Sequence, residues 1–537
     1  MENYLTRWDK KIRSNQKLVE SIILLIIFAV SMMIRRIGIK HGFPILTHPD
    51  EITIIQPVLD MTRLHSLNPG IFSRPDQILD YLNLIFLNIV SFLKYGQNVY
   101  WAFEEHYLVF YFYSRLLISI MGSLIPIVAY KIGKEIKPKL ALPATIVFAT
   151  FPLYVEHSLY ITPDIPITLF TLLIIYFAIK YLNTQKNIYL ILATAFTAIN
   201  TAEKYPGILS LALVILALGL QIFCNDKTTQ PKKFKRFLLK SLLIAIVFIV
   251  SLFVVAPFLF IEYKSVIQAL VTESRSTHLG ADGLGWLGNM WFYLKTFYAN
   301  VNILGILLLI LGIVVFIKDF DKKSILVLYG IFYWVTLSKL ALHWERWALP
   351  MYIAPLFLIS FGIAKLSEVK QKPKVIRWAS ILVLFLFLFQ QGIHSIYTPI
   401  RLKYTDTRVI SLNFCDANGI TQDNSIYEGY TPLQPTYSKT LFTYYPSEES
   451  DKEFIILSSS MFNRFYAEPV RYQKEIAIYE TIRTENELIG QFNPTPIAKN
   501  IFDQIENIIY FFRYRLGLTN EVRYSGPTIE IYQNSGR

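Results

Sequence analysis

Long uninterrupted apolar runs constrain the fold of this chain more than any other feature of its sequence. Residues 237–257 and 376–392 carry almost no charged side chains, and their length suits helices that cross a lipid bilayer. Hydrophobic residues make up 53% of the chain and charged residues only 17%, against roughly 25% charged residues in an average soluble domain. The sequence therefore predicts an all-α protein that crosses a membrane many times.

The positive charge of the chain lies mainly in short loops between these apolar runs. The net charge is +13, but basic loops of this kind stay in the cytoplasm and bind anionic lipid headgroups. We therefore expect membrane lipids, and no nucleic acid, as partners of this charge. The clusters are Lys131, Lys134, Lys137 and Lys139; Lys232, Lys233, Lys235 and Arg236; Lys318, Lys322 and Lys323; and Lys370, Lys372, Lys374 and Arg377.

The basic clusters also predict an orientation. Placing them in the cytoplasm, together with the basic N-terminus (Arg7, Lys10, Lys11, Arg13 and Lys17), gives about eleven transmembrane helices and a C-terminus outside the cell. The first helix has no small-residue cleavage site after it, so we expect a retained signal anchor in a multi-pass protein of the plasma (inner) membrane. The predicted spans lie near 18–34, 109–130, 140–156, 165–182, 188–203, 207–223, 237–257, 297–317, 324–342, 347–365 and 376–392.

Residues 76–94 are long enough to cross the membrane, but a crossing there would put the Lys131–Lys139 cluster outside. Asp80, Asn83, Ser91 and Lys94 recur at helical spacing and form one polar stripe. We therefore predict a helix that lies in the outer membrane interface.

The composition changes near residue 393. Proline, asparagine, serine and charged residues return, and no later apolar run is long enough to span a membrane. Short β-rich runs occur at 453–458 and 528–532, and 500–516 has the pattern of a helix that Gly517 ends. The two cysteines, Cys224 and Cys415, suggest no disulfide framework.

These features predict two domains. Residues 1–392 form the transmembrane domain, in which an outer loop at 35–108 carries interfacial helices. Residues 393–537 form a small α/β domain outside the cytoplasm, of roughly the size of one ordinary domain.

Four polar motifs fall on the outer side of this topology, which was drawn from the basic loops alone. Ionisable groups at membrane depth are costly, so a cluster that faces one vestibule indicates a functional site. The motifs are His48-Pro49-Asp50-Glu51, Thr162-Pro163-Asp164, Glu203-Lys204-Tyr205 and His343-Trp344-Glu345-Arg346.

The residue types in these motifs suit transfer of a group from a phosphate. Asp50 can accept a proton from an attacking hydroxyl or amine, and Glu51 or Asp164 can orient the acceptor or hold a divalent metal. Lys204 and Arg346 can bind the phosphate as it leaves, and we place His343 with them. The further candidates are His48 and Tyr205.

Each motif also has a purely structural interpretation. Asp50, Glu51 and Asp164 stand where helices begin, so their carboxylates can cap helix amides. Lys204 can extend to the membrane interface, and Arg346 can contact lipid headgroups.

The motifs resemble a known family. His48-Pro49-Asp50-Glu51, the helical pattern at 51–64 with Leu67-Asn68-Pro69, and Lys204-Tyr205 are similar to the GT-C class of membrane glycosyltransferases. The similar group is glycosyltransferase family 39, with the protein O-mannosyltransferases and the lipid A aminoarabinose transferases. The resemblance covers roughly residues 18–365. It implies a catalytic Asp50 with Glu51 beside it, and it gives Asp164 and Lys204 the positions of the family's outer aspartate and lysine.

The resemblance also implies the reaction, which is transfer of a monosaccharide from a polyprenyl-phosphate donor with inversion at the anomeric carbon. The sequence after residue 393 lacks the sugar-binding repeats of the eukaryotic mannosyltransferases, so a protein acceptor is not carried over. We expect a lipid or cell-envelope glycan as acceptor on the outer face of the plasma membrane. The alternatives are a transporter or lipid flippase, and a polysaccharide polymerase or ligase.

Overall fold

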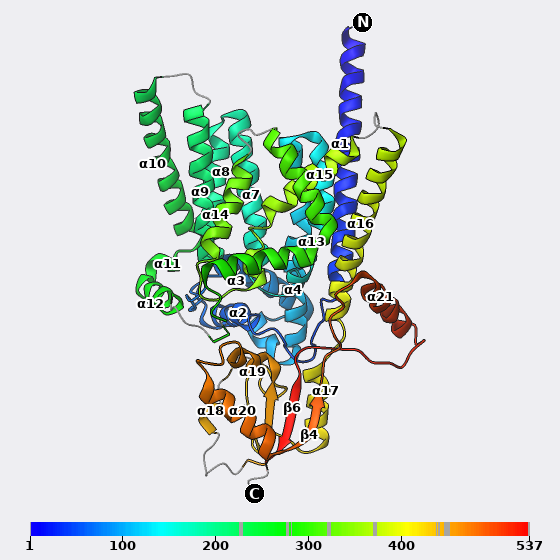
Figure 1. The fold of residues 1–537 in the computed structure, drawn as a ribbon. Coiled ribbons are helices and arrows are strands. Elements are labelled where there is room, and N and C mark those ends of the chain that lie inside the picture. The colour runs from blue at the N-terminus through cyan, green and yellow to red at the C-terminus, as the bar shows by residue number, and fades with distance from the viewer. Residues whose placement is uncertain are drawn as a thin grey trace.

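The protein has two parts that follow one another along a common axis, a helical bundle and a small domain that contains a sheet (Figure 1). The computed structural model describes residues 2–224, 229–274, 279–280, 282–318, 324–368, 373–435, 438, 441–444 and 452–534, with side chains of the first helix from Leu18 onward. The N-terminus lies at the far end of the bundle, and the C-terminus lies at the far end of the small domain. We call the end of the bundle next to this domain the domain-facing end.

Every predicted span coincides with a helix or with consecutive helices of the bundle. These elements are α1 (Glu2–Arg36), α4 (Val99–Ile136), η1 (Pro138–Leu140) with α5 (Ala141–Ala149) and α6 (Pro152–His157), α7 (Asp164–Thr184), α8 (Asn187–Glu203), η2 (Tyr205–Leu209) with α9 (Ser210–Gly219) and η3 (Leu220–Cys224), α10 (Gln230–Val255), α13 (Gly285–Lys318), α14 (Ile325–Leu337), α15 (Ile353–Ser367) and α16 (Lys374–Leu402). Within the described part of the chain, 8 helices are long and apolar enough to cross a membrane. The protein is therefore a multi-pass membrane protein, as predicted.

The helices differ from the predicted spans mainly in length. The span predicted at 140–156 is broken before Pro152, because a proline disfavours helical backbone at the residue before it and Phe151 is extended (φ −74°, ψ 114°). Helix α13 begins at Gly285 and is interrupted at Asn302, whose φ of 56° is left-handed. Helix α16 continues to Leu402, beyond the predicted end at residue 392.

Two glycines let α13 and α15 pack closely. A Cβ atom at Gly312 would collide with the carbonyl oxygen of Leu358, and one at Gly362 would collide with that of Leu308. Only glycine leaves room for a backbone at this distance. This contact fixes α15, and with it the turn that precedes α15 and carries Arg346.

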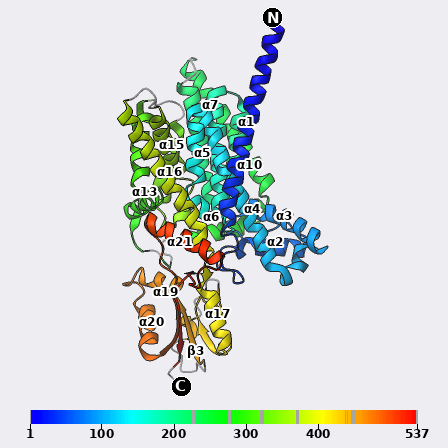
Figure 2. The ribbon, with the colours of Figure 1, turned by 90° about the vertical axis from the view of Figure 1, so that its right-hand side faces the viewer.

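Helices α2 (Ile52–Leu64) and α3 (Gln77–Tyr95) pack against each other and project sideways at the domain-facing end of the bundle (Figure 2). Helix α3 coincides with the helix predicted at 76–94, and it is one of the 8 described helices that are long and apolar enough to cross a membrane. The polar stripe of α3 does not face water, however, because Asp80, Asn83 and Ser91 are buried. Apolar residues such as Ile85 and Phe92 are exposed instead, which suits a helix with lipid on one side and protein on the other.

The first predicted cytoplasmic loop, at Lys131–Lys139, is tied to neighbouring helices by two ion pairs. Lys134 lies 2.6 Å from Glu20 of α1, and Lys139 lies 2.9 Å from Glu368 beside α15. The predicted basic residues Lys322, Lys323, Lys370 and Lys372, and the side chains of the basic N-terminus, lie outside the described residues.

The C-terminal part contains a four-stranded sheet of order β2-β3-β6-β4, with β2 (Ser425–Tyr427), β3 (Phe454–Ser458), β6 (Ile529–Gln533) and β4 (Glu487–Phe492). Strands β2 and β3 are parallel, and β6 is antiparallel to both of its neighbours. The predicted strands at 453–458 and 528–532 are thus paired with each other. A second, two-stranded sheet joins β1 (Thr405–Asp406) to β5 (Tyr524–Ser525).

The remaining helices of this part are α17 (Thr407–Ala417), α18 (Leu441–Tyr444), α19 (Ser459–Tyr466), α20 (Gln473–Glu485) and α21 (Ile501–Arg515). Helix α21 confirms the helix predicted at 500–516. Its buried residues are Gln504, Asn507 and Tyr510, whereas the apolar residues Ile509 and Phe512 are exposed. This helix returns to pack against α16 of the bundle.

Candidate active site

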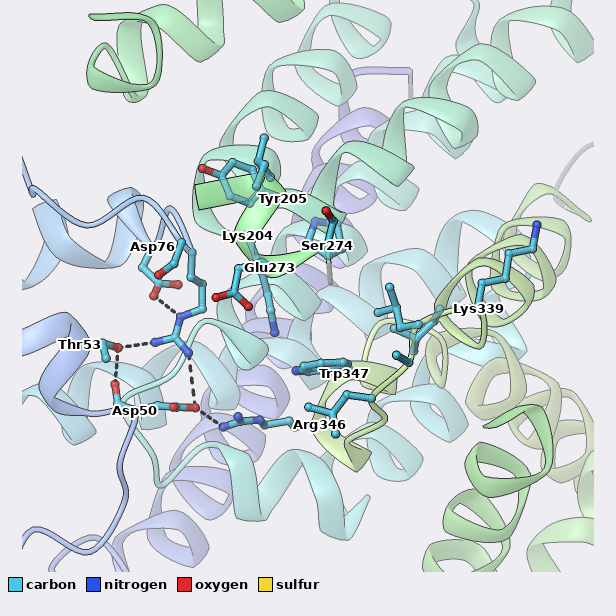
Figure 3. Close-up of a pocket in the computed structure, with 18 of the residues that line it drawn as sticks. Asp50, Thr53, Asp76, Lys204, Tyr205, Glu273, Ser274, Lys339, Arg346 and Trp347 are labelled. Atoms are coloured by element: carbon cyan, nitrogen blue, oxygen red, sulfur yellow. Dashed lines mark hydrogen bonds and ion pairs between the residues drawn. The ribbon is translucent and has the colours of Figure 1, made fainter. Parts of the chain in front are cut away.

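A cavity of about 830 Å³ lies at the domain-facing end of the bundle. Its walls come from the start of α2, the loop before α3, the turn between α8 and η2, the end of α12 (Tyr263–Glu273), the end of α14 and the turn before α15. Helix α12 follows the short helix α11 (Phe258–Ile261), between α10 and α13. The cavity therefore gathers segments that are far apart in the sequence (Figure 3).

Asp50 stands on the cavity wall with an arginine on each side (Figure 3). Its Oδ2 atom lies 2.5 Å from Nη1 of Arg346 and 3.4 Å from Nη1 of Arg74. Burial alone would raise the pKa of Asp50, but Arg346 and Arg74 outweigh it and hold this pKa well below its ordinary value. The carboxylate is therefore ionised and balanced by positive charge.

Asp164 and Lys204 form the second ion pair of the site. Nζ of Lys204 donates to Oδ1 of Asp164 at 2.8 Å, and Nε of Arg346 lies 3.8 Å from Oδ2 of the same aspartate. The Asp164 side chain is only 1% exposed. Lys204 also lies 5.7 Å from the centre of the Trp347 ring. Arg346 thus connects Asp50 with Asp164, and the four polar groups form one network.

The two aspartates and the lysine of this network are held by charged partners. Neither α2 nor α7 has a side-chain hydrogen bond at its N-cap, and both aspartates pair with cations instead. The Lys204 side chain is 13% exposed and is held by Asp164, so it does not extend freely to the membrane interface.

Arg74 is a member of the site that the sequence analysis missed. Its guanidinium donates to Asp76 and to Thr53, both on the cavity wall. Asp76 has a left-handed backbone (φ 45°) and is almost fully buried, a strained conformation of the kind that clusters at functional sites. The lone arginine in Arg74-Pro75-Asp76 was the available signal.

The loop that carries Arg74 is tied to the turn that carries Lys204. The backbone N–H of Asp76 donates to the carbonyl of Glu203 at 3.0 Å. The N–H of Leu79 donates to Oε2 of the same glutamate, also at 3.0 Å. These bonds fix the spacing between Arg74 and Lys204.

Glu51 does not line the cavity. Its carboxylate is fully buried and accepts two hydrogen bonds from Arg115, at 2.8 and 2.7 Å. Arg115 also donates to the carbonyls of Ile39 and His41. Glu51 therefore stabilises the loop through Arg115 and does not face the cavity, contrary to the predicted catalytic role.

The other predicted residues lie around the cavity or outside it. Tyr205 is on the wall, and its hydroxyl donates to the carbonyl of Phe72 at 2.8 Å. Nδ1 of His48 accepts from the backbone N–H of Asp50 at 3.3 Å, and burial lowers the pKa of His48 to about 3, so this ring is neutral. His343 packs against the ring of Phe292 and lies 3.5 Å from Asp282, and it does not line the cavity.

A second polar cluster adjoins His48. Tyr160 lies beside the rings of His48 and His157, with centroids 4.5 and 5.8 Å away. Next to His157, Glu156 pairs with Arg401 at 3.1 Å. The sequence analysis did not select these residues, because no motif sets them apart before the chain is folded.

From the sequence, Glu51 or Asp164 could hold a divalent metal. Among the described residues, no group of three or more histidine, cysteine, aspartate or glutamate side chains is arranged to hold a metal ion. The carboxylates of Asp50 and Asp164 are instead occupied by basic side chains.

Known proteins were compared with the chain. Residues 111–261 match the sequence model of the dolichyl-phosphate-mannose-protein mannosyltransferase family. No curated protein matches the sequence. The crystal structure of ArnT from Cupriavidus metallidurans in the apo state is similar, with a TM-score of 0.52, 10% identity, and coverage of 88% of this chain and 96% of that chain. The structure of the same protein bound to undecaprenyl phosphate covers 95% of this chain and 90% of that chain, at 10% identity and a TM-score of 0.46.

The comparisons confirm the predicted family resemblance and fold class. The chain has the GT-C fold of ArnT, an all-α membrane domain with a small C-terminal α/β part. The family model adds that the segment from α4 to α11 is like that of a glycosyltransferase. The fold is thus that of the GT-C glycosyltransferases, and residues 111–261 are similar to the dolichyl-phosphate-mannose-protein mannosyltransferase family.

Proposed function

We propose that the protein transfers one sugar from a polyprenyl-phosphate donor to a lipid or cell-envelope glycan acceptor, on the outer face of the plasma membrane. The observation that carries this proposal is the ionised Asp50 on the wall of a cavity that also presents Arg74, Lys204 and Arg346. A carboxylate among three cations suits a reaction that needs both a base and a site for a phosphate. The family match, which names a dolichyl-phosphate sugar donor, supports the same chemistry.

The three cations differ in what they offer to a phosphate. Arg74 and Arg346 have planar forks that form two parallel hydrogen bonds, whereas Lys204 is a point charge. All three are held near the cavity by Asp50, Asp76 or Asp164, so their charge is gathered there before a phosphate enters. Such preorganised charge stabilises a leaving group more than flexible charge would.

The apolar wall of the cavity suits the lipid part of the donor. Leu270 of α12, Leu337 of α14, and Leu340 and Leu342 after α14 face the same space as the cations. A polyprenyl phosphate has the same division, with an anionic head next to an apolar chain.

In the proposed step, the acceptor hydroxyl or amine attacks the anomeric carbon of the sugar while the bond from this carbon to the phosphate oxygen breaks. The electron pair of that bond leaves with the polyprenyl phosphate, which Arg74, Lys204 and Arg346 stabilise. Asp50 accepts the proton of the nucleophile. A single displacement inverts the anomeric configuration, as in the family that the sequence resembles.

The ion pairs of Asp50 suggest how donor binding prepares this step. With Arg346 and Arg74 beside it, Asp50 is a weak base, because both arginines lower its pKa. A bound phosphate would draw the two guanidinium groups toward its own oxygens and return basicity to Asp50. The base would thus become effective when the donor is in place.

Transfer of radiolabelled sugar in purified membranes tests the proposal. With a polyprenyl-phosphate sugar as donor, we expect a new labelled glycoside from the wild-type protein and none from Asp50→Asn. A transporter or flippase would move the labelled donor across the membrane without forming a glycoside. A polymerase or ligase would transfer a whole glycan, so the mass added to the product separates this alternative.

Cysteine labelling tests the proposed orientation, in which the N-terminus is cytoplasmic and the C-terminal domain is extracytoplasmic. Single cysteines at the exposed positions Gln97 and Lys474 should react with an impermeant thiol reagent added outside the cell. Cysteines at the exposed positions Lys139 and Lys235 should not. The native Cys224 and Cys415 are replaced first, and outside labelling at Lys235 would contradict the orientation.

A further inference from the structure

The C-terminal domain reaches the loop that carries Asp50. Nη1 of Arg408, in the first turn of α17, donates to the carbonyl oxygen of Thr47 at 3.0 Å. Thr47 is followed directly by His48-Pro49-Asp50. The Arg408 side chain is 7% exposed, so this contact is shielded from water.

Arg408 is itself fixed in position. Its Nε and Nη2 atoms donate to the two carboxylate oxygens of Asp406, at 2.8 and 2.9 Å, and Asp406 also caps α17. Gly526 leaves room for this carboxylate, because a Cβ atom there would lie 2.6 Å from Oδ1 of Asp406. The backbone of Gly526 is left-handed (φ 99°), which also favours glycine.

The same domain reaches the turn that carries Arg346. The guanidinium of Arg464, in α19, lies 5.9 Å from the centre of the Trp344 ring. The guanidinium of Arg346 lies at the same distance, 5.9 Å, from this ring. Arg464 also donates to the hydroxyl of Tyr430 at 3.0 Å. Trp344 is thus close to both a site arginine and an arginine of the C-terminal domain.

We propose that the C-terminal domain positions the catalytic pair, with Arg408 and Arg464 as its positioning residues. One arginine holds the segment of Asp50 and the other holds the segment of Arg346. The 2.5 Å contact between Asp50 and Arg346 joins these two segments. The proposal rests on the proposed function, since it assigns the domain a part in the same reaction.

The bundle alone holds only part of this geometry. Arg115 of α4 fixes the loop at Ile39, His41 and Glu51, but Thr47 is held from the C-terminal domain. A displacement of about 1 Å in a catalytic group can reduce turnover by about a hundredfold. Loss of the Arg408 contact should therefore lower kcat although Arg408 does not line the cavity.

Kinetics of the full-length Arg408→Lys and Arg464→Gln proteins, with a polyprenyl-phosphate sugar as donor, test the proposal. We expect kcat to fall about tenfold to a hundredfold in Arg408→Lys, and by less in Arg464→Gln. We also expect the acid limb of kcat/KM to move to higher pH in Arg408→Lys, because an Asp50 displaced from Arg346 no longer has its pKa held low by that arginine. Loss of folded protein alone would not move this limb.

Arg471→Gln is the matched control, since Arg471 belongs to the same domain and its ion pair with Glu468 is exposed. Hydrogen exchange of residues 44–51 gives a readout that does not depend on activity. Exchange should be faster in Arg408→Lys and unchanged in Arg471→Gln.

Unchanged exchange in this segment, or an unchanged kcat and pH profile in an active protein, would overturn the positioning role. If the wild-type protein forms no glycoside with any polyprenyl-phosphate sugar but shows the Arg408-dependent exchange, the proposed function fails and the contact with Thr47 stands.

Discussion

Two adjacent carboxylates of this protein have opposite surroundings. Asp50 is 22% exposed on the wall of the cavity, and two arginines share one of its oxygens. Glu51 is fully buried, and both of its oxygens are matched by the fork of Arg115. The backbone N–H of Ile161 also donates to Oε1 of Glu51 at 3.1 Å, so Glu51 is enclosed by donors of the protein itself, whereas Asp50 stands on the cavity wall. Partner geometry, and not the residue type, therefore separates the reactive group from the supporting one.

The largest expected effect is a difference in turnover between variants of Asp50 and variants of Glu51. Asp50→Asn should keep the fold and lose about two to four orders of magnitude in turnover, because an amide cannot accept the proton. Glu51→Gln should instead leave the Arg115 charge buried without its partner, at a cost of about 3–5 kcal/mol in stability. Turnover and thermal unfolding of both variants test the difference. A well-folded Asp50→Asn protein with more than half of the wild-type activity would contradict the assignment.

The next effect concerns the shape of the cation beside Asp50. Arg346→Lys should recover only a little of the activity that Arg346→Ala loses. The point charge of a lysine cannot contact both Asp50 and Asp164, and it cannot bind a phosphate through two parallel hydrogen bonds. Turnover of both variants, compared with wild type at equal protein levels, measures this. Full activity of Arg346→Lys would show that only charge matters at this position.

A smaller effect is expected from the cations farther from the Asp50–Arg346 contact. Each charge-assisted contact to the phosphate is worth roughly 1.5–3 kcal/mol, so Lys204→Ala and Arg74→Ala should each reduce kcat/KM by about ten- to a hundredfold. If the contact strengthens as the phosphate leaves, kcat falls as well as the apparent affinity. Donor titrations measure both quantities. Unchanged kcat and KM in both variants would remove these residues from the phosphate site.

The carboxylate of Glu428 can be compared with those of Asp50 and Glu51, and its substitution should change turnover least. Glu428 of the C-terminal domain is fully buried, and its carboxylate accepts hydrogen bonds from the backbone N–H of Ser458 and the hydroxyl of Tyr479. Its burial raises the pKa from the ordinary value of 4.5 to about 8. The folded state thus binds a proton that the unfolded state releases, so this contribution to stability is complete below about pH 4.5 and is lost as the pH rises through 8.

Glu428→Gln resembles the protonated form and should remove this part of the pH dependence. Thermal unfolding of wild type and variant at pH 6 and pH 9 measures the effect, and we expect the variant to lose less stability between the two values. Equal losses would mean that Glu428 does not carry the raised pKa.

The sequence predicts the membrane fold well and the site only in part. Apolar runs locate the spans because lipid demands them, and the outer motifs place Asp50, Asp164, Lys204 and Arg346, which the structure brings together. Sequence proximity could not separate Glu51 from Asp50, because the difference depends on Arg115, which is remote in the sequence. Arg74 was missed because its role depends on the left-handed turn at Asp76.

The part played by the C-terminal domain could not be predicted either. The contacts of Arg408 and Arg464 with the bundle join residues that are hundreds of positions apart in one case and more than a hundred in the other. No local pattern marks such pairs. The polar stripe of α3 illustrates the same limit, since a stripe shows that one face is polar but not whether water or protein covers it.

The central claim is that Asp50 acts on the nucleophile while the nearby cations bind the phosphate. The most direct test measures donor binding and product formation on the same purified Asp50→Asn protein, with a polyprenyl-phosphate sugar as donor. We predict binding at least as tight as that of wild type, because the arginines released from Asp50 become available to the phosphate, together with almost no glycoside. Loss of donor binding in step with loss of product would contradict the account, because it would make Asp50 part of the donor site and not the base.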